Sequence, residues 1–395
     1  MPLRFLTAGE SHGPALVAIL EGLPAGLTVN VELIDAELIR RQRGYGAGPR
    51  MKIEQDQVRI LAGVMQGVTT GAPLALRIEN RDHVRWRGRP IEPLTIPRPG
   101  HADLTGALKY GYRDLRPALE RASARETAAR VAVGTVCKQL LAQFDMRIGG
   151  YVVAIGEIEA DLRDLSLVER LERAEESEVR CPDAQAAQAM RLRIEEIIRL
   201  RDTLGGVLEI VALGVPPGLG SYVHWDRRLE TRLGAAVLSV PAVKGVEIGS
   251  AFQNARLPGT QVQDTIRLEK GELTRDSNRA GGVEGGITNG QPLLIRAAMK
   301  PIATTLTPQK SVDLAQGRQV DTQYERSDFC PVPRAVPILE AVIAFVLADA
   351  LLEKLGGDSL DEMLPRFSAL RRPRLSDLPM DDVAHTFWPE EADDD

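Results

Sequence analysis

Short apolar stretches, several of them alternating with polar positions, recur along the whole chain and predict β-strands. Glycine or proline borders most of these stretches, as is typical of tight turns between strands. The stretches lie at residues 3–8, 15–21, 58–64, 74–78, 150–159, 206–213 and 292–298. Because they fall on both sides of the middle of the chain, we expect strands in both halves.

Other segments carry apolar residues at helical spacing, namely 35–43, 119–144, 165–203, 227–239 and 335–355. The first of them begins with Asp35 and ends in a cluster of arginines, an order of charges that suits a helix dipole. The segment 335–355 is the most apolar of the chain, but Glu340 and Asp349 interrupt it. We therefore expect a buried helix there and not a membrane span.

The two halves both alternate strands, glycine turns and helices, which hints at an internal pseudo-repeat without a fixed period. No low-complexity linker divides the chain. We predict one large α+β domain over residues 1–370, in which the charged segment 160–203 forms an outlying helical element. Eight acidic residues follow Arg372, so we expect 371–395 to be an acidic, mobile tail.

Composition narrows the class of protein. The chain of 395 residues is 44% apolar and 26% charged, as in soluble globular proteins with a large core. A net charge of −6 and an aromatic content of 4% argue against nucleic acid as a partner. Residues 1–130 nevertheless hold 19 Lys and Arg against 14 Asp and Glu. This basic third indicates either a local anion site or an ordinary fluctuation of surface charge.

The three cysteines form no paired motif, and the first residues do not resemble a signal peptide. A reducing cytoplasm is the expected location, without membrane association. No Cys/His cluster predicts a metal site. The chain also lacks a Walker A sequence, the dinucleotide-binding fingerprint and a nucleophile elbow, which removes the most common nucleotide and hydrolase classes.

Two of the five histidines lie in polar, turn-prone signatures. His12 stands in Gly-Glu-Ser-His-Gly at 9–13, and His101 stands in Arg-Pro-Gly-His-Ala-Asp at 98–103. Histidine moves protons most readily near neutral pH, and Asp103 could orient the ring of His101. These features predict an acid/base pair. The alternatives are a turn histidine that caps backbone groups and a local Asp–His contact.

Cationic and glycine-rich segments supply candidate anion-binding groups. Arg121 and Arg125 are one helical turn apart with Ser123 between them, so both guanidinium groups could face one ligand or pair with Glu120 and Glu126 on a solvated face. Arg40 and Arg41 could likewise either bind an anionic ligand or lie on a solvated helix face. The glycine-dense run 281–290, followed by Lys300, is typical of a binding loop.

Many of these motifs together resemble the chorismate synthase family. The resemblance runs from Arg4 to about Leu364 and rests on motifs that occur in register at 9–13, 40–46, 51–58, 69–73, 98–103, 121–127, 214–226, 243–249, 281–292, 299–302 and 325–328. It implies a β-α sandwich and a homotetramer. It also implies the conversion of 5-enolpyruvylshikimate 3-phosphate to chorismate with reduced FMN, as an anti-1,4 elimination of phosphate with no net redox change.

The resemblance also implies roles for individual residues. His12 would serve protonation at the flavin, His101 would assist the departure of phosphate as a general acid, and Asp328 would orient the flavin end of the site. Arg40, Arg41 and Arg125 would face the substrate or NADPH, a possible reductant of the flavin. The implied FMN contacts are Arg121, Ala122, Ser123, Pro241, Ala242, Gly285, Lys300, Pro301, Ile302, Ala303, Thr304 and Arg326.

Two positions depart from the family pattern. Ala47 stands where the family usually has arginine, so Arg41 lacks a second cation there unless Arg43 or Arg50 substitutes for it. Pro241 stands where asparagine is common. A flavin oxidoreductase acting on a phosphorylated acid is the rival enzyme, and an RNA-binding protein is the rival outside enzymes. The sequence does not say whether the protein reduces its own flavin or uses a separate flavin reductase.

Overall fold

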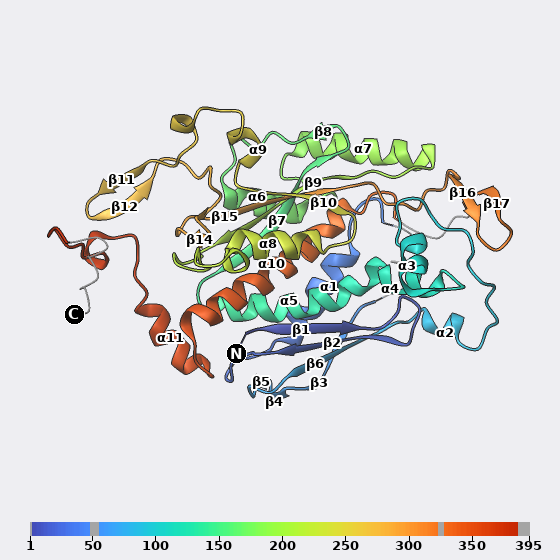
Figure 1. The fold of residues 1–395 in the computed structure, drawn as a ribbon, viewed down its shortest axis with the longest axis horizontal. Helices are drawn as coiled ribbons and strands as arrows, with labels where there is room; N and C mark the ends of the chain where they lie inside the picture. Colours follow the sequence, from blue (N-terminus) through green and yellow to red (C-terminus); the bar gives the residue numbers. More distant parts are fainter. Residues whose placement is uncertain (1, 48–54, 323–327, 386–395) are drawn as a thin grey trace, which may run out of the picture.

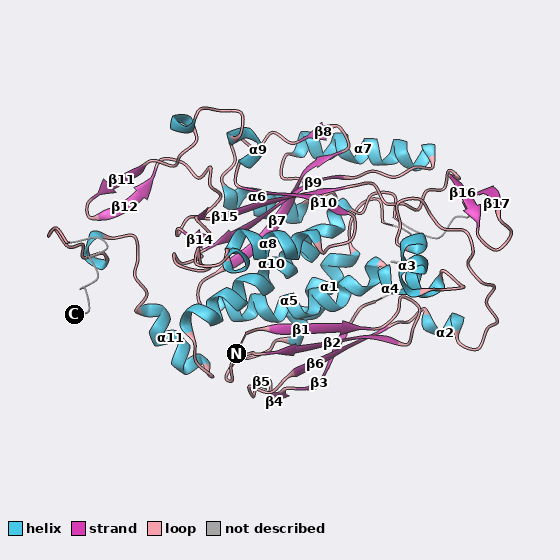
Figure 2. Ribbon diagram, viewed as in Figure 1, coloured by secondary structure: helices cyan, strands magenta, loops and turns pink. Residues whose placement is uncertain are grey.

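The computed structural model describes residues 2–47, 55–322 and 328–385. Two antiparallel sheets lie on either side of a layer of helices, which gives a β-α-β sandwich (Figures 1 and 2). This architecture confirms the prediction of an α+β fold.

The first sheet has four strands in the order β1-β2-β6-β3. Its inward face carries the alternate apolar residues of each strand, such as Leu16, Ala18 and Leu20, which are buried against the helices. This alternation is the pattern of an antiparallel sheet with one covered face. The strands are β1 (Arg4–Ala8), β2 (Ala15–Glu21), β3 (Val58–Ala62) and β6 (Leu74–Glu79), close to their predicted bounds.

The second sheet has five strands in the order β10-β15-β9-β7-β8. Its strands come from the second half of the chain apart from β7 and β8. They are β7 (Arg147–Ile155), β8 (Ile158–Glu159), β9 (Gly206–Leu213), β10 (Val243–Ile248) and β15 (Leu293–Met299). In the centre, β15 runs antiparallel to β9, so that Leu293 pairs with Ala212 and Met299 with Gly206.

Four helices fill the space between the sheets: α1 (Val31–Gln42), α5 (Thr127–Ala142), α8 (Leu229–Leu238) and α10 (Val332–Leu355). Helix α10 is long enough to cross a membrane, and the mean hydropathy of its most apolar 18 residues is 2.2. However, 89% of that stretch is buried inside the protein. It is the central core helix and packs along α5. At their crossing, a Cβ atom added to Gly134 would lie 2.3 Å from Ala341 Cβ.

Two predicted helix boundaries were wrong. The segment 119–144 is not one helix, because Ser123 is extended and its hydroxyl accepts a hydrogen bond from Arg125 N. It divides into α4 (Arg116–Ala122), a short 3₁₀ turn (Ala124–Glu126) and α5. Helix α1 begins at Val31, four residues before the predicted start, because the Asn30 side chain caps Leu33 N.

The helices of 160–203 are α6 (Leu167–Glu176) and α7 (Ala184–Leu200). They do not stand apart from the domain. Leu171 and Ala174 of α6 pack on the outer face of the five-stranded sheet, against Tyr151 and Val211. Met190 and other apolar residues of α7 join the main core. The charged faces that suggested an outlying element are the solvent-facing sides of these two amphipathic helices.

Small elements surround the sandwich. The hairpins are β4 (Val64–Met65) with β5 (Val68–Thr69), β11 (Ile266–Glu269) with β12 (Glu272–Arg275), β13 (Val283–Glu284) with β14 (Ile287–Thr288), and β16 (Lys310–Asp313) with β17 (Arg318–Asp321). The short helices are α2 (His83–Trp86), α3 (Asp103–Tyr110), α9 (Ala251–Asn254) and α11 (Leu360–Ser368), with 3₁₀ turns at Trp225–Arg227, Gly259–Gln261 and Leu375–Asp377.

The start of the predicted tail is paired with the domain. Leu273 N of β12 donates to Pro373 O at 2.7 Å, and Glu272 forms a β-bridge with Arg374. The mobility of the tail stays a prediction, although its first residues pair with the domain. Their main-chain groups extend the β11–β12 hairpin, which acidic composition alone does not reveal.

Candidate active site

His12 lies in the loop between β1 and β2. The loop begins at Gly9, whose φ of +110° is accessible to glycine, and a Cβ atom there would lie 2.4 Å from Ala15 O. The His12 Nδ1 atom lies 2.7 Å from Glu120 Oε1, and its backbone N–H donates to Glu120 Oε2 at 2.7 Å. The imidazole also packs on the Trp86 ring, with 4.6 Å between centroids.

His101 precedes α3 and is held in a similar way. Its Nδ1 atom lies 2.5 Å from Asp103 Oδ1, and Asp103 is fully buried. Arg98 Nε donates to the other carboxylate oxygen at 2.8 Å, while Arg98 Nη2 lies 3.1 Å from His101 Nδ1. Burial raises the pKa of Asp103, but the hydrogen bonds from His101 and Arg98 outweigh it and hold that pKa well below the usual range.

Packing of two helices links the histidine loops. Glu120 lies in α4 and Asp103 begins α3, and these helices are so close that a Cβ atom on Gly106 would lie 2.8 Å from Ala118 Cβ. Helices α2, α3 and α4 gather at one end of the molecule (Figure 1, right). The predicted acid/base residues are therefore supported by neighbouring elements, each with a carboxylate on Nδ1.

Several predicted cofactor residues lie beside these loops. Ser123 Oγ donates to Ser11 Oγ at 3.1 Å, next to His12, and Arg121 Nη2 donates to Thr7 O at 3.0 Å. Ala122 lies between them and ends α4. The structure thus brings the segment 121–123 to the His12 loop.

The segments 241–242 and 300–304 meet each other and the His101 loop. Lys300 N donates to Ala242 O at 2.9 Å, beside Pro241. Lys300 Nζ donates to Gly100 O at 3.3 Å, and Arg98 Nη1 donates to Thr304 Oγ1 at 3.2 Å. The residues between Lys300 and Thr304 are Pro301, Ile302 and Ala303.

Gly285 is not brought to this group within one chain. It forms the turn of the β13–β14 hairpin, and Thr288 of that hairpin pairs with residues just after β9. Lys300 follows the other end of β15, where Met299 pairs with Gly206. The strand between these ends is about 20 Å long. Arg326, with Arg50, falls outside the described residues.

Asp328 and Arg41 are connected through Arg334. Arg334 Nη1 forms an ion pair with Asp328, and Arg334 Nε donates to Arg41 O at 3.0 Å. The Arg41 side chain is buried, donates to Thr127 Oγ1 at 3.0 Å, and lies 3.5 Å from Asp56. Burial lowers the pKa of Arg41 to about 9.

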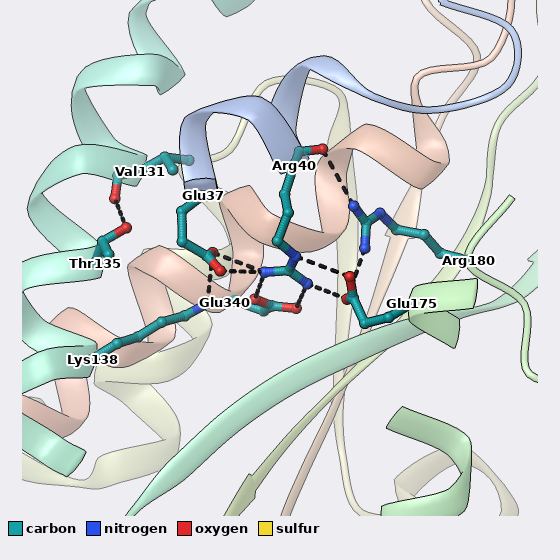
Figure 3. Close-up of polar contacts among 8 residues, drawn as sticks. All are labelled: Glu37, Arg40, Val131, Thr135, Lys138, Glu175, Arg180 and Glu340. Atoms are coloured by element: carbon teal, nitrogen blue, oxygen red, sulfur yellow. Dashed lines mark hydrogen bonds and ion pairs between the residues drawn. The ribbon is translucent and has the colours of Figure 1, made fainter. Parts of the chain in front are cut away.

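Arg40 and Arg125 face protein carboxylates in this structure. Arg40 lies at the centre of an ion network with Glu37, Glu175 and Glu340, in which Lys138 and Arg180 also take part (Figure 3). Arg125 Nη1 donates to both oxygens of the buried Asp56, at 2.6 and 2.7 Å. That Arg40, Arg41 and Arg125 contact substrate or NADPH stays a prediction.

Sequence reasoning missed Glu120, Arg98 and Trp86 as neighbours of the two imidazoles. Arg98 stands within the His101 signature, so its spacing was a usable signal. Glu120 lies 108 residues from His12 along the chain. Trp86 is similarly remote, and a single sequence gives no sign of such contacts.

Comparisons with known proteins decide the family. A family model described as chorismate synthase matches residues 3–352. The chain belongs to the chorismate synthase family. It is therefore a carbon–oxygen lyase, as the resemblance in its sequence motifs implied.

Individual relatives agree along nearly the full chain. Chorismate synthase of Trichlorobacter lovleyi is 53% identical over 378 residues, which cover 91% of this chain and 96% of that protein. The protein of the same name from Desulforudis audaxviator is 55% identical over 377 residues, which cover 92% of this chain and 95% of that protein. A solved crystal structure of chorismate synthase is 46% identical, with a TM-score of 0.77 and coverage of 93% and 97%.

Proposed function

We propose that this enzyme converts 5-enolpyruvylshikimate 3-phosphate to chorismate, with reduced FMN used catalytically and no net redox change. The observation that carries the proposal is the pair of carboxylate-anchored imidazoles, His12 and His101, on neighbouring elements of a chorismate synthase fold. A 1,4 elimination breaks the bond between carbon and the phosphate oxygen and removes a ring proton. It therefore needs groups that hold or move protons at two places.

The residues beside the imidazoles fit a flavin that bears a phosphate. The donor set combines the cations Arg121 and Lys300 with the hydroxyl groups of Ser123 and Thr304. Ala242 has a positive φ of 68°, and its carbonyl group binds the main chain at Lys300, which fixes the two segments together. These residues, with Ala122, Pro241 and 301–303, would hold FMN. When bound, reduced FMN supplies electron density to the reacting substrate.

His101 is the general acid in this proposal. As the acid, His101 acts in its doubly protonated form: its Nδ1–H donates to the ionised Asp103, and the proton on Nε2 passes to the leaving phosphate. Arg98 brings a positive charge beside the ring, which suits a site where phosphate leaves. His12 holds or moves a proton at its own Nε2, on the other loop.

The assembly is proposed to be a homotetramer in the cytoplasm, and NADPH or a separate flavin reductase would supply the reduced flavin. Within one chain, Gly285 lies at the far end of the five-stranded sheet from Lys300. Gly285 can join a flavin site near Lys300 only if it comes from a neighbouring subunit, which an oligomer provides.

An anaerobic assay with photoreduced FMN and the enolpyruvyl substrate tests the roles of the two histidines. We expect His12→Ala and His101→Ala each to lower the rate at least about tenfold, because general acid–base groups contribute that much or more. The matched control is His224→Ala, since His224 is exposed and outside the described site. Near-normal turnover in both active-site variants would contradict the assigned proton roles.

A further inference from the structure

Three contacts join Glu120 to the His12 loop. The Glu120 carbonyl oxygen accepts from Ser11 N at 3.2 Å. One carboxylate oxygen accepts from His12 N at 2.7 Å, and the other lies 2.7 Å from His12 Nδ1. A single residue of α4 thus holds both the backbone and the ring of His12, which fixes the loop conformation and the ring rotamer together.

The chemistry of these contacts defines which ring nitrogen carries the proton. An ionised carboxylate only accepts hydrogen bonds, so Nδ1 of His12 is the donor. Burial raises the pKa of Glu120, but the hydrogen bonds from His12 outweigh it and hold that pKa below the usual range. Glu120 is therefore ionised near neutral pH. The Nε2 atom of His12 is left to exchange protons.

The other surroundings of His12 also restrain the ring. Trp86 packs on it from α2, and His83 Nδ1 donates to His12 O at 2.9 Å. The charged groups nearby are Arg116 on α4, whose charge acts on Glu120, together with Glu10 on the same loop and Asp82 beside α2. Of these groups, only Glu120 contacts an imidazole nitrogen of His12 within the described part of the chain.

We propose that Glu120 is a positioning residue for the reaction, which keeps His12 in its Nδ1–H form with Nε2 directed to the reacting groups. The proposal rests on the proposed role of His12. Asp103 holds Nδ1 of His101 by the same kind of contact. In both cases a carboxylate from one of two packed helices binds Nδ1 of the imidazole, while His101 also contacts Arg98.

The state of the ring can be read directly by ¹⁵N NMR of the full-length protein labelled at histidine. Comparison with His12→Ala identifies the His12 signals among the five histidines. In the wild type, at a pH where the signals no longer change, we expect Nδ1 to be protonated and Nε2 to be unprotonated. The reverse tautomer would overturn the proposal, whatever the activity of the enzyme.

Glu120→Gln provides the complementary test, because its amide has one acceptor where the carboxylate has two. If the amide oxygen keeps the bond from His12 N, the NH₂ group faces Nδ1 and favours the Nε2–H tautomer. We expect this tautomer change together with a fall in kcat of about tenfold and a KM change below about twofold. Glu172→Gln, on the exposed face of α6, is the matched control.

A double-mutant cycle separates positioning from a purely structural role. Glu120→Gln added to His12→Ala should lower kcat by less than about twofold, because the residue on which Glu120 acts is already gone. A further loss of about tenfold would overturn the proposal. Full activity of His12→Ala itself would refute the role of His12, while the NMR result would still judge whether Glu120 sets the tautomer.

Discussion

At the residue scale, the feature that matters most is an imidazole whose Nδ1 is bound by a carboxylate. For His101 the partner is Asp103, two positions away, so the sequence was sufficient to suggest it. For His12 the partner is Glu120, which the sequence suggested only as an ion partner of Arg121 or Arg125. Local contacts can be read from spacing, whereas contacts across the chain depend on how the helices pack.

Buried ion pairs are a second feature at this scale. A substitution at Glu340 tests how much such pairs stabilise the fold. Its carboxylate is fully buried, 2.9 Å from Arg40 Nη1 and 2.5 Å from Lys138 Nζ. Replacing Glu340 by glutamine leaves those cations partly unpaired, although Glu37 remains. We expect a loss of about 3 kcal/mol in the free energy of unfolding, at the lower end for broken buried pairs. Urea denaturation, with Glu172→Gln as control, measures it.

The same variant has an expected pH dependence. Burial raises the pKa of Glu340, but Lys138 and Arg40 outweigh burial and hold it well below the usual range. The stabilisation is therefore complete above the ordinary glutamate pKa of about 4.3, and it is lost as the pH falls toward the folded-state value. The stability difference between wild type and Glu340→Gln should shrink below about pH 4. A difference that grows on acidification would contradict this account.

At the element scale, hydrophobic periodicity located the sheets and the core helices well. Strands β2 and β9 have their predicted bounds, and α10 lies where the longest apolar segment predicts it. Periodicity failed where a single polar side chain decides the backbone, as at Asn30 and Ser123. It also missed the β13–β14 hairpin, because that glycine-rich segment has little apolar alternation.

The contact of α5 with α10 gives an element-scale prediction. Gly134→Ala places a methyl group against Ala341, so the helices must separate, and we expect about 1–3 kcal/mol of destabilisation. The control is Gly234→Ala in α8, where the added Cβ atom would lie 3.9 Å from Val246 Cγ1, an ordinary van der Waals distance. There alanine should stabilise the helix by roughly 0.5–1 kcal/mol. Thermal unfolding of both variants measures this, and equal effects would contradict the packing argument.

At the scale of the whole molecule, two sheets around a helical layer bring loops from distant parts of the sequence to one end. The loops 9–13, 98–103 and 300–304 are connected there through α3, α4 and Lys300. Motif resemblance predicted the members of this group, but strand order and helix packing depend on long-range pairing that local sequence does not encode. The strand order also places Gly285, in the β13–β14 turn, at the other end of β15 from Lys300 and the histidine loops.

The central claim is an elimination that uses reduced flavin only as a catalyst. Its most direct test is the ratio of phosphate released to reductant consumed, measured anaerobically with limiting photoreduced FMN and excess 5-enolpyruvylshikimate 3-phosphate. We expect many molecules of phosphate and chorismate for each reduced flavin, which stays reduced at the end. One phosphate per reductant oxidised is the result of a flavin oxidoreductase, and it would contradict the account.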